Sequence, residues 1–222
     1  MKRVLLSWSS GKDSAWALHL LRKMDVEVAG LLTTFNEAAN RVAMHAVRHS
    51  LVEAQSAASG VPLWSVPLPA PCSNQSYEEI MARVTSDAVA RGINAIAFGD
   101  LYLQEIREYR ERMLAGTGLE PLFPVWGIPT GQLAREMIAG GLKAKITCID
   151  KKVLDPRFAG RDYDEAFLSE LPASVDPCGE NGEFHSFAYA GPMFSIPIPV
   201  VSGEHRDSDG FLFTDLVAAG GG

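Results

Sequence analysis

The chain has 222 residues, of which 47% are hydrophobic and 21% charged, and its net charge is −7, a composition typical of a globular protein with one large or two small cores. No apolar stretch reaches the roughly 20 residues of a membrane span, and the longest basic run is Lys151-Lys152, so membrane-spanning and nucleic-acid-binding proteins are disfavoured. Three scattered cysteines without a Cys-x-x-Cys pair exclude a disulfide framework, and we expect a cytoplasmic protein with neither nucleic acid nor membrane as a partner.

In the first half, apolar segments rich in β-branched residues alternate with helix-periodic segments. Strands are predicted at residues 3–8, 26–35, 62–68 and 93–99. Helices are predicted between them, most clearly where Ala17, Leu20, Leu21 and Met24 follow i, i+3, i+4, i+7 spacing. Strands that are apolar on both faces and separated by helices indicate a parallel sheet covered on both sides. The predicted fold class is therefore α/β, with a Rossmann-like parallel sheet.

The second half has a different pattern. After a predicted helix at 104–115, the stretch GTGLEPLFPVWGIPTG (116–131) is rich in glycine and proline and breaks the periodicity. We place a domain boundary near Gly118, which gives domains 1–118 and 119–222. The second is predicted as a smaller α+β domain, with helices at 131–139 and 163–171, a strand at 144–149 and a proline-punctuated strand in MFSIPIPVV (193–201).

The turn after the first strand, SSGKDS (9–14), contains a Gly-Lys pair. A Walker A loop is excluded, because that motif requires a glycine and a Ser/Thr at positions that here hold Leu6 and Asp13. A Ser-x-x-Lys acyl transferase is excluded as well, because its companion S-D-N and K-T-G motifs are absent. A capped helix with a solvated lysine would explain the small hydroxyls, but not Gly-Lys-Asp among them.

A strand, a Ser/Gly turn and a helix that begins near Asp13 would bring backbone N–H groups and the positive end of a helix dipole together, which favours an anion-binding loop. Serine hydroxyls would add donors, Gly11 would permit close approach, Lys12 would supply a charge and Asp13 would hold Mg²⁺. The candidate residues of this loop are Ser7, Ser9, Ser10, Gly11, Lys12, Asp13 and Ser14.

The SSGKDS segment resembles the S-G-G-K-D-S pyrophosphate loop of the N-type ATP pyrophosphatases, which split ATP between its α and β phosphates. The resemblance implies that ATP, with Mg²⁺, binds at this loop. Ser10 stands where that family commonly has glycine. If the backbone adopts positive φ there, Ser10 will be strained.

Three later segments, RVAMHAV, AFGDLYLQEIREYRERMLAGTGLEPLFPVWG and DPCGENGEFHSFAYAGPMF, resemble the family of diphthine–ammonia ligase over nearly the whole chain. This resemblance implies an adenine nucleotide alpha-hydrolase-like first domain that binds ATP. It also implies that a carboxylate is adenylated and then captured by ammonia to give an amide.

Further candidates lie at the predicted carboxyl ends of the strands, where α/β sheets bind ligands. Gly99 and Asp100 follow the fourth strand, although they would equally suit a polar turn, and Arg107 and Arg110 lie on one helix face, where guanidinium groups suit phosphate. Glu111 is more simply explained as an i, i+4 ion pair with Arg107. The adenine is expected near Leu32, Thr33 and Thr34, and His45 either reaches the nucleotide or caps a surface helix.

The segment CGENGEFH places Glu180, Glu183 and His185 around an Asn-Gly turn. Structurally this reads as a hairpin turn, but the family resemblance favours binding of a second metal, orientation of ammonia or general-base catalysis. Cys178 and His185 alone are too few ligands for zinc. Glu180, Glu183 and His185 form the predicted catalytic set together with Lys12 and Asp13. We expect the site to lie between the two domains.

The predicted function is that of an ATP-dependent ligase that forms an amide from a carboxylate and ammonia through an acyl-adenylate, releasing AMP and pyrophosphate. The alternatives are another N-type pyrophosphatase, such as a sulfur-transfer enzyme, and a nucleotide-sensing module without turnover. The sequence does not identify the carboxylate acceptor, which is either a small molecule or a modified protein side chain. Whether the protein forms a homodimer is left open as well.

Overall fold

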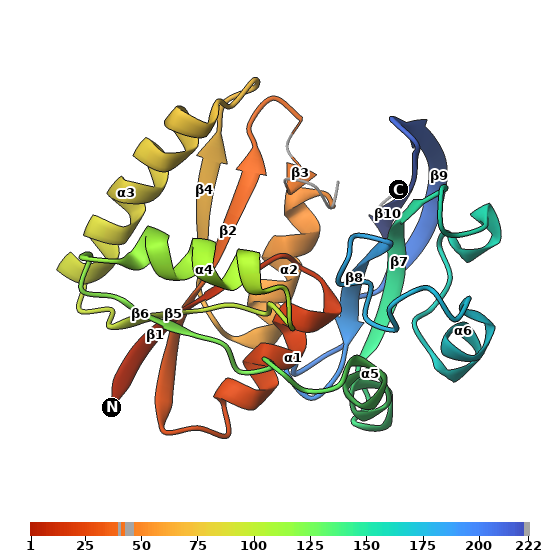
Figure 1. Cartoon of the computed structure of the whole chain (residues 1–222), viewed down its shortest axis with the longest axis horizontal. Helices are drawn as coiled ribbons and strands as arrows, with labels where there is room; N and C mark the ends of the chain where they lie inside the picture. The colour runs from red at the N-terminus through yellow and green to blue at the C-terminus, as the bar shows by residue number, and fades with distance from the viewer. Residues whose placement is uncertain (40, 43–46, 220–222) are drawn as a thin grey trace.

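The computed structural model describes residues 1–39, 41–42 and 47–219, which form two sheets lying side by side with helices around them (Figure 1). The first sheet contains β1 (Lys2–Ser7), β2 (Val26–Asn36), β3 (Arg41–Val42), β4 (Leu63–Leu68), β5 (Ala95–Ala97) and β6 (Glu120–Leu122). The second contains β7 (Lys143–Asp150), β8 (Phe184–Ala190), β9 (Val200–Ser208) and β10 (Phe211–Ala218). The helices are α1 (Lys12–Leu21), α2 (His49–Ser59), α3 (Asn74–Ala90), α4 (Gln104–Leu114), α5 (Thr130–Ala139), α6 (Glu165–Glu170) and a 3-10 turn at Pro156–Phe158.

The first sheet confirms the predicted α/β class. Strands β4, β2, β1, β5 and β6 are hydrogen-bonded in that order and all run parallel, while the short β3 pairs antiparallel with the end of β2. Alternate residues of β1 face opposite sides of the sheet. Leu5 packs in a cluster with α3 and α4, whereas Val4 and Leu6 pack in the cluster that contains α1 and α2. Both faces are therefore covered, as the two-sided apolar strands predict.

The second sheet is antiparallel, in the order β8, β7, β10, β9, which confirms the smaller α+β unit. The strand predicted within 193–201 is wrong, because residues 193–199 form turns and irregular chain and β9 begins only at Val200. Pro197 and Pro199 have no N–H to donate to a ladder, which explains the difference. The hairpin of β9 and β10 was not predicted. Its first strand is exposed and polar, so it lacks an alternating apolar pattern.

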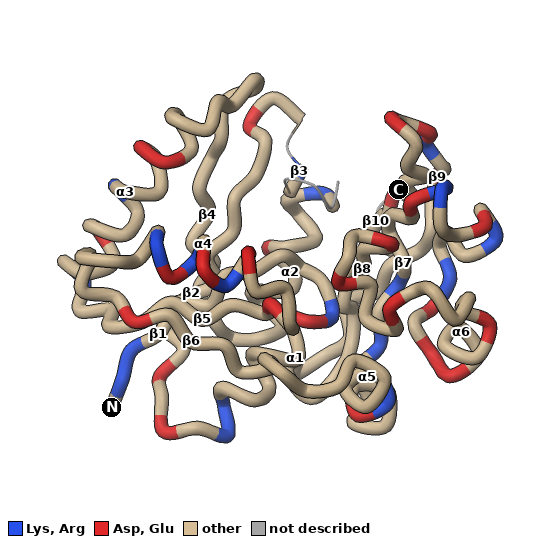
Figure 2. Tube along the Cα trace, in the orientation of Figure 1, with Lys and Arg blue, Asp and Glu red and all other residues tan. Residues whose placement is uncertain are grey.

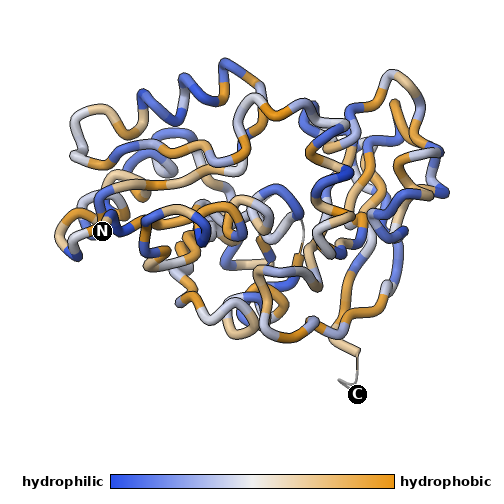
Figure 3. Tube along the Cα trace, turned by 90° about the horizontal axis from the view of Figure 1, so that it is seen from below, coloured by the Kyte–Doolittle hydropathy of each residue, from blue (hydrophilic) through white to orange (hydrophobic). Residues whose placement is uncertain are grey.

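One hydrophobic cluster joins the two halves of the chain. It includes Leu18 of α1, Leu133 of α5 and Phe187 of β8, all fully buried, and hydrophobic stretches appear in both halves of the trace (Figure 3). The fit is close between α1 and the end of α5, since a Cβ on Gly140 would lie 2.4 Å from the Trp16 ring. The halves are thus packed together rather than connected only by a linker.

Two surface properties bear on the expected partners. Among the described residues, none of the helices combines the length and apolar character that crossing a bilayer demands. Lysine and arginine are interspersed with aspartate and glutamate along the trace (Figure 2).

Candidate active site

The loop between β1 and α1 gathers small hydroxyl groups at the amino end of the helix. Gly11 is the N-cap of α1 in extended conformation, and the Ser14 hydroxyl donates to its carbonyl at 3.0 Å. The Ser9 hydroxyl lies 3.1 Å from that of Ser14 and accepts the Gly11 N–H at 3.3 Å. Small hydroxyl groups therefore surround the amino end of a regular helix, where the helix dipole favours a negative charge.

Ser10 has a φ of +69°, so the strain predicted at this position is confirmed. Its carbonyl accepts the Ala188 N–H at 3.0 Å, which joins the loop to β8. Its hydroxyl is buried and has no hydrogen-bond partner among the described residues. Ser10 thus contributes its backbone to the loop and lines neither of the two cavities described below.

Gln55 on α2 supports the loop from behind and was not predicted as a functional residue. Its side-chain amide donates to the carbonyls of Ser10 at 2.9 Å and Ala188 at 2.7 Å, and it accepts from Trp8 Nε1 at 2.8 Å. The sequence signal for this role was a polar residue on the apolar face of its helix, because a buried amide needs partners.

A cavity of about 330 Å³ lies where the two halves meet, and we call it the junction cavity. Gly99 permits the close approach of strand β5 to helix α1, since a Cβ there would lie 3.0 Å from the Ser14 backbone nitrogen. The first half contributes Ser7, Ser9, Gly11, Lys12, Asp13, Ser14, Phe98, Gly99, Asp100, Leu103, Ile106 and Arg110. The second half contributes Cys178, Gly179, Glu180, Gly182, Phe184, His185 and Ser186. The cavity thus lies between the halves, as expected for the site.

Glu180 is the acidic residue of the second half that reaches the junction cavity. Its carboxylate accepts the Leu101 N–H at 2.8 Å, a contact between segments 79 residues apart. Burial raises the pKa of Glu180 to about 7, helped by the negative charges of Asp13 and Asp100 and opposed by the Leu101 hydrogen bond. A carboxyl group with this pKa exchanges protons near neutral pH, as a general base requires.

The other two residues of the predicted catalytic turn differ in position. His185 is the second residue of β8 and lines the junction cavity, where burial, with the nearby Lys12 charge, lowers its pKa to about 4, so its ring is neutral at pH 7. Glu183 is 6% exposed and lines neither cavity. Its carboxylate accepts from the Asp176 N–H at 3.0 Å, the Asn181 N–H at 2.9 Å and the Asn181 side-chain amide at 3.0 Å, so it holds the turn.

The Asn181-Gly182 turn is not the tip of a hairpin. It leads from an irregular segment into β8, whose antiparallel partner β7 ended at Asp150. The three hydrogen bonds to Glu183 replace the ladder that a hairpin would have supplied.

Lys12 and Asp13 form an ion pair at the start of α1. The Lys12 ammonium lies 2.8 Å from one carboxylate oxygen of Asp13 and 3.1 Å from the other, and it also donates to the Cys178 carbonyl. Burial alone would lower the pKa of Lys12, but the charge and hydrogen bonds of Asp13, together with Cys178 and Glu180, raise it, so the ammonium remains charged. Asp13 is half-buried and lines the junction cavity.

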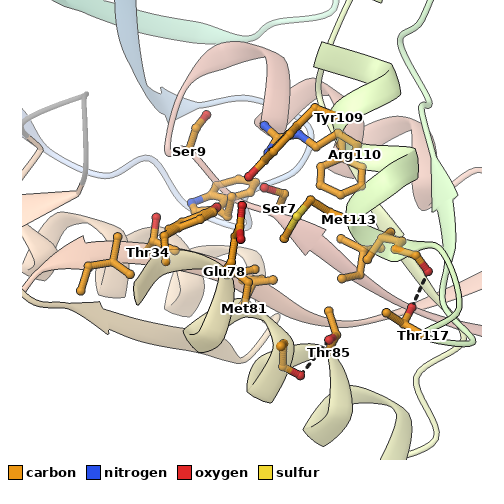
Figure 4. Close-up of a pocket in the computed structure, with 18 of the residues that line it drawn as sticks. Ser7, Ser9, Thr34, Glu78, Met81, Thr85, Tyr109, Arg110, Met113 and Thr117 are labelled. Atoms are coloured by element: carbon orange, nitrogen blue, oxygen red, sulfur yellow. Dashed lines mark hydrogen bonds between the residues drawn. The ribbon is translucent and has the colours of Figure 1, made fainter. Parts of the chain in front are cut away.

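A second cavity, of about 520 Å³, lies between α3 and α4, and we call it the α3–α4 cavity. Figure 4 shows Glu78 and Met81 of α3 opposite Tyr109, Arg110 and Met113 of α4. The α3–α4 cavity shares Ser7, Ser9, Phe98 and Arg110 with the junction cavity, so one ligand can occupy both. The lining residues Tyr77, Glu78 and Tyr109 were not predicted, and no motif in the sequence marks them.

The residues predicted near the nucleotide divide into two groups. Leu32 and Thr34 line the α3–α4 cavity, whereas Thr33 is buried and donates its hydroxyl to the Trp8 carbonyl. Asp100 and Arg110 lie in the junction cavity as an ion pair at 3.2 Å.

Two further predicted residues, besides Ser10, Thr33 and Glu183, are not placed in a cavity. Arg107 lines neither one: it pairs with Glu111 at 2.8 Å and covers the rings of Phe123 and Trp126, with its guanidinium carbon 4.8 and 4.9 Å from their centroids. The Arg107–Glu111 pair expected from the spacing is confirmed. His45 lies outside the described residues.

The described residues include no group of three or more His, Cys, Asp and Glu side chains that could hold a metal ion. Asp13 is therefore a candidate for a single carboxylate contact rather than part of a protein metal cage.

Comparison with known proteins connects this arrangement to a family. The model of the diphthamide synthase N-terminal domain matches residues 1–121, and that of the diphthamide synthase C-terminal domain matches residues 129–215. The chain is 25% identical to diphthine–ammonia ligase of Bos taurus over 91% of its own length and 84% of that protein. It is 28% identical to the Homo sapiens protein of that name and 29% to the Mus musculus protein, in each case over 60% of its own length, and it spans only about half (52%) of those two relatives. The chain therefore belongs to the diphthamide synthase family.

Proposed function

We propose that this chain is an ATP-dependent ligase that joins a carboxylate to ammonia, the reaction type for which its relatives are named. The observation that carries the proposal is the junction cavity, in which the amino end of α1 faces Glu180 and His185. An anion-binding loop and a proton acceptor in one cavity suit a reaction in which a phosphate-activated carboxylate is attacked by an amine.

In this proposal ATP spans both cavities. Its phosphates lie at the amino end of α1, where the hydroxyls of Ser9 and Ser14 and the positive end of the helix dipole favour anions. The nucleoside enters the α3–α4 cavity, past Leu32 and Thr34. Arg110 lines both cavities and is placed to contact the phosphates on one side.

Magnesium fits this site as an ion bound mainly by the phosphates. Asp13 would supply one carboxylate oxygen, and Mg²⁺ commonly takes one or two carboxylates plus phosphate oxygens. When bound, the ion would neutralise phosphate charge. Gly99 lets α1 approach β5 closely, which leaves Asp13 and Ser14 at the cavity wall without an intervening side chain.

The reaction would proceed in two displacements. An oxygen of the acceptor carboxylate attacks the α-phosphorus, a new P–O bond forms and the bond to pyrophosphate breaks. Ammonia then attacks the acyl carbon, AMP leaves with the electrons of the C–O bond, and the nitrogen loses a proton. The first step is needed because a carboxylate oxygen is a poor leaving group, and the loop stabilises the charge that develops on pyrophosphate.

Glu180 is the group best placed to take the proton from the nitrogen. It is held by the Leu101 N–H, it lines the junction cavity, and its pKa of about 7 leaves a substantial deprotonated fraction at neutral pH. The neutral ring of His185 can accept a hydrogen bond and orient the incoming nitrogen. Glu183 would contribute by keeping the turn in shape.

The acceptor is proposed only by class. The relatives act, by name, on diphthine; for this chain the acceptor is a carboxylate, carried by a small molecule or by a modified protein side chain. Free ammonia is the proposed nitrogen source.

The test uses the full chain with Mg²⁺, ATP labelled in the α-phosphate, and either a diphthine-bearing protein or small-molecule carboxylates. We expect exchange of labelled pyrophosphate into ATP that requires the acceptor but not ammonium, and then one AMP and one pyrophosphate per amide once ammonium is added. Formation of ADP and phosphate would mean an acyl-phosphate route and would contradict the proposal. Nucleotide binding with neither exchange nor AMP across all acceptors would favour a sensing module.

A further inference from the structure

The side chain of Lys12 joins its own loop to the second half of the chain. It is 2% exposed, although lysine is rarely buried so completely. Its ammonium donates to the carbonyl of Cys178, a residue 166 positions further along the chain. Asp13 takes the remaining hydrogen bonds at 2.8 and 3.1 Å, so all three ammonium protons have acceptors.

The aromatic residues around this ammonium also come from the second half. The ammonium nitrogen is 5.3 Å from the centroid of the Phe184 ring and 5.4 Å from that of Tyr163. Both distances are within the range in which a cation is attracted to an aromatic ring. Lys12 is therefore held by partners on both sides of the junction.

The Cys178 carbonyl lies two residues before Glu180. The Glu180 carboxylate is held from the other side by the Leu101 N–H, which belongs to the first half. The segment 178–180 thus has two attachments to the first half, the Lys12 ammonium at one end and the Leu101 amide at the other. Loss of either attachment would weaken the hold of the first half on the segment that carries Glu180.

We propose that Lys12 is a positioning residue, whose buried ammonium holds the segment bearing Glu180 against the ATP-binding loop instead of binding a phosphate group. For the role of Glu180, this inference rests on the proposed function. The placement of the segment by Lys12 does not depend on that function. The sequence-based assignment of Lys12 as a charge for the phosphates is replaced by this role, because a contact with phosphate would require the ammonium to leave the Cys178 carbonyl and both rings.

The first test measures hydrogen exchange by mass spectrometry on the full chain without any ligand, in the parent and in Lys12→Met. We expect the Leu101 amide and the amides of residues 179–183 to exchange about tenfold faster or more in the variant, since a hydrogen bond from a charged group is stronger than one between neutral groups. Lys23→Met is the matched control, because Lys23 is exposed just beyond α1. Unchanged exchange in Lys12→Met would overturn the proposal.

The second test separates positioning from phosphate binding. The dissociation constant of α,β-methylene-ATP, which cannot be cleaved between its α and β phosphates, should change by less than about threefold in Lys12→Met, while kcat for AMP formation falls about tenfold or more. A tenfold weaker affinity with normal exchange at Leu101 would assign Lys12 to the phosphates and overturn the proposal. Exchange and analogue binding need no turnover, so they remain decisive if the ligase activity itself is not found.

A folding defect in Lys12→Met would arise from the unpaired Asp13 carboxylate. The double variant Lys12→Met/Asp13→Asn removes both charges and leaves the Cys178 carbonyl without its ammonium donor. We expect faster exchange at Leu101 in this variant as well. Parent-like exchange there would equally contradict the proposal.

Discussion

The two cavities of this protein differ in origin. All residues that line the α3–α4 cavity lie between positions 7 and 117, and they come from the first sheet, from α3 and α4, and from the loops next to these elements. The junction cavity takes its proton-accepting side chains, Glu180 and His185, from the second half. Under the proposed function, the first half would bind the nucleoside by itself, whereas the chemistry would require the second half to be docked against it.

The difference follows from how each cavity is built. The carboxyl ends of parallel strands form a crevice in any fold of this class, so β1, β2 and β5 need no outside help to create it. The junction cavity depends on contacts between distant segments. The Ser10 carbonyl is bonded to the Ala188 N–H, and the Glu180 carboxylate to the Leu101 N–H. Substitutions in the two cavities should therefore affect different steps.

The largest expected effect is on chemistry, from a change in the junction cavity. Glu180→Gln removes the proposed base but keeps an oxygen to accept the Leu101 N–H, so kcat for amide formation should fall about 10²–10⁴-fold. Affinity for α,β-methylene-ATP should change little, because in the proposed function Glu180 makes no contact with the nucleotide. The control is Glu79→Gln, an exposed glutamate on α3. Retention of full amide-forming activity by Glu180→Gln would rule out its role as the base.

The sequence predicted more of the lining of the junction cavity than of the α3–α4 cavity, where Tyr77, Glu78 and Tyr109 carry no motif. Apolar strands separated by amphipathic helices identify a parallel sheet, and most residues of the Ser-Ser-Gly-Lys-Asp-Ser turn line the junction cavity. At the junction, sequence reasoning treated Glu180 and Glu183 as equivalent. They differ only because one meets the Leu101 N–H of the first half and the other holds its own turn, and this depends on long-range packing.

Other residues were missed for the same reason. The partner of Lys12 is a backbone carbonyl, which has no side-chain signature in a sequence. The β9–β10 hairpin was not predicted because an exposed, polar edge strand lacks the alternation that marks a half-buried one. The features that could be predicted are periodic and local, whereas those that were missed either depend on contacts between distant segments or lack a periodic pattern.

A change confined to the α3–α4 cavity should affect binding alone. Met81→Trp replaces the thioether side chain by the larger indole ring and so fills part of this cavity. Affinity for ATP should therefore fall about tenfold, equivalent to about 1.4 kcal/mol. At saturating ATP, kcat should remain that of the parent, since the junction cavity is untouched. Calorimetric titration with the analogue and steady-state kinetics would measure the two quantities. Met24→Trp, at an exposed position, is the control. A fall in kcat as large as the loss of affinity would contradict the inference that the α3–α4 cavity affects binding alone.

Ionisation of Glu180 should raise the activity of the protein and lower its stability. Its pKa is raised from 4.5 in the unfolded chain to about 7 in the folded protein, so between these values the folded state binds more protons and stability falls as pH rises. Glu180→Gln lacks this ionisation. The variant should therefore gain in Tm relative to the parent between pH 4.5 and 7, and keep that gain above pH 7.

Thermal denaturation across this pH range would measure the effect, and kcat/KM of the parent should rise through about pH 7 as the base loses its proton. A difference in Tm that does not change with pH would mean that the Glu180 carboxyl is not perturbed by burial.

The smallest expected effect comes from Ser10, which lies beside both cavities and lines neither. Its φ of +69° costs a non-glycine residue about 1–2 kcal/mol, and its buried hydroxyl has no partner among the described residues. Ser10→Gly removes both costs and adds about 0.5–1 kcal/mol of backbone entropy to the unfolded chain. The balance should be a gain of about 1 kcal/mol, or a Tm higher by about 2–4 °C.

Affinity for the ATP analogue and kcat should not change in Ser10→Gly, because the Ser10 carbonyl still accepts from Gln55 and Ala188. If Ser10→Gly instead lost affinity at unchanged or higher stability, the serine hydroxyl would belong to the nucleotide site. Residues of the loop that line neither cavity would then also contribute to nucleotide binding.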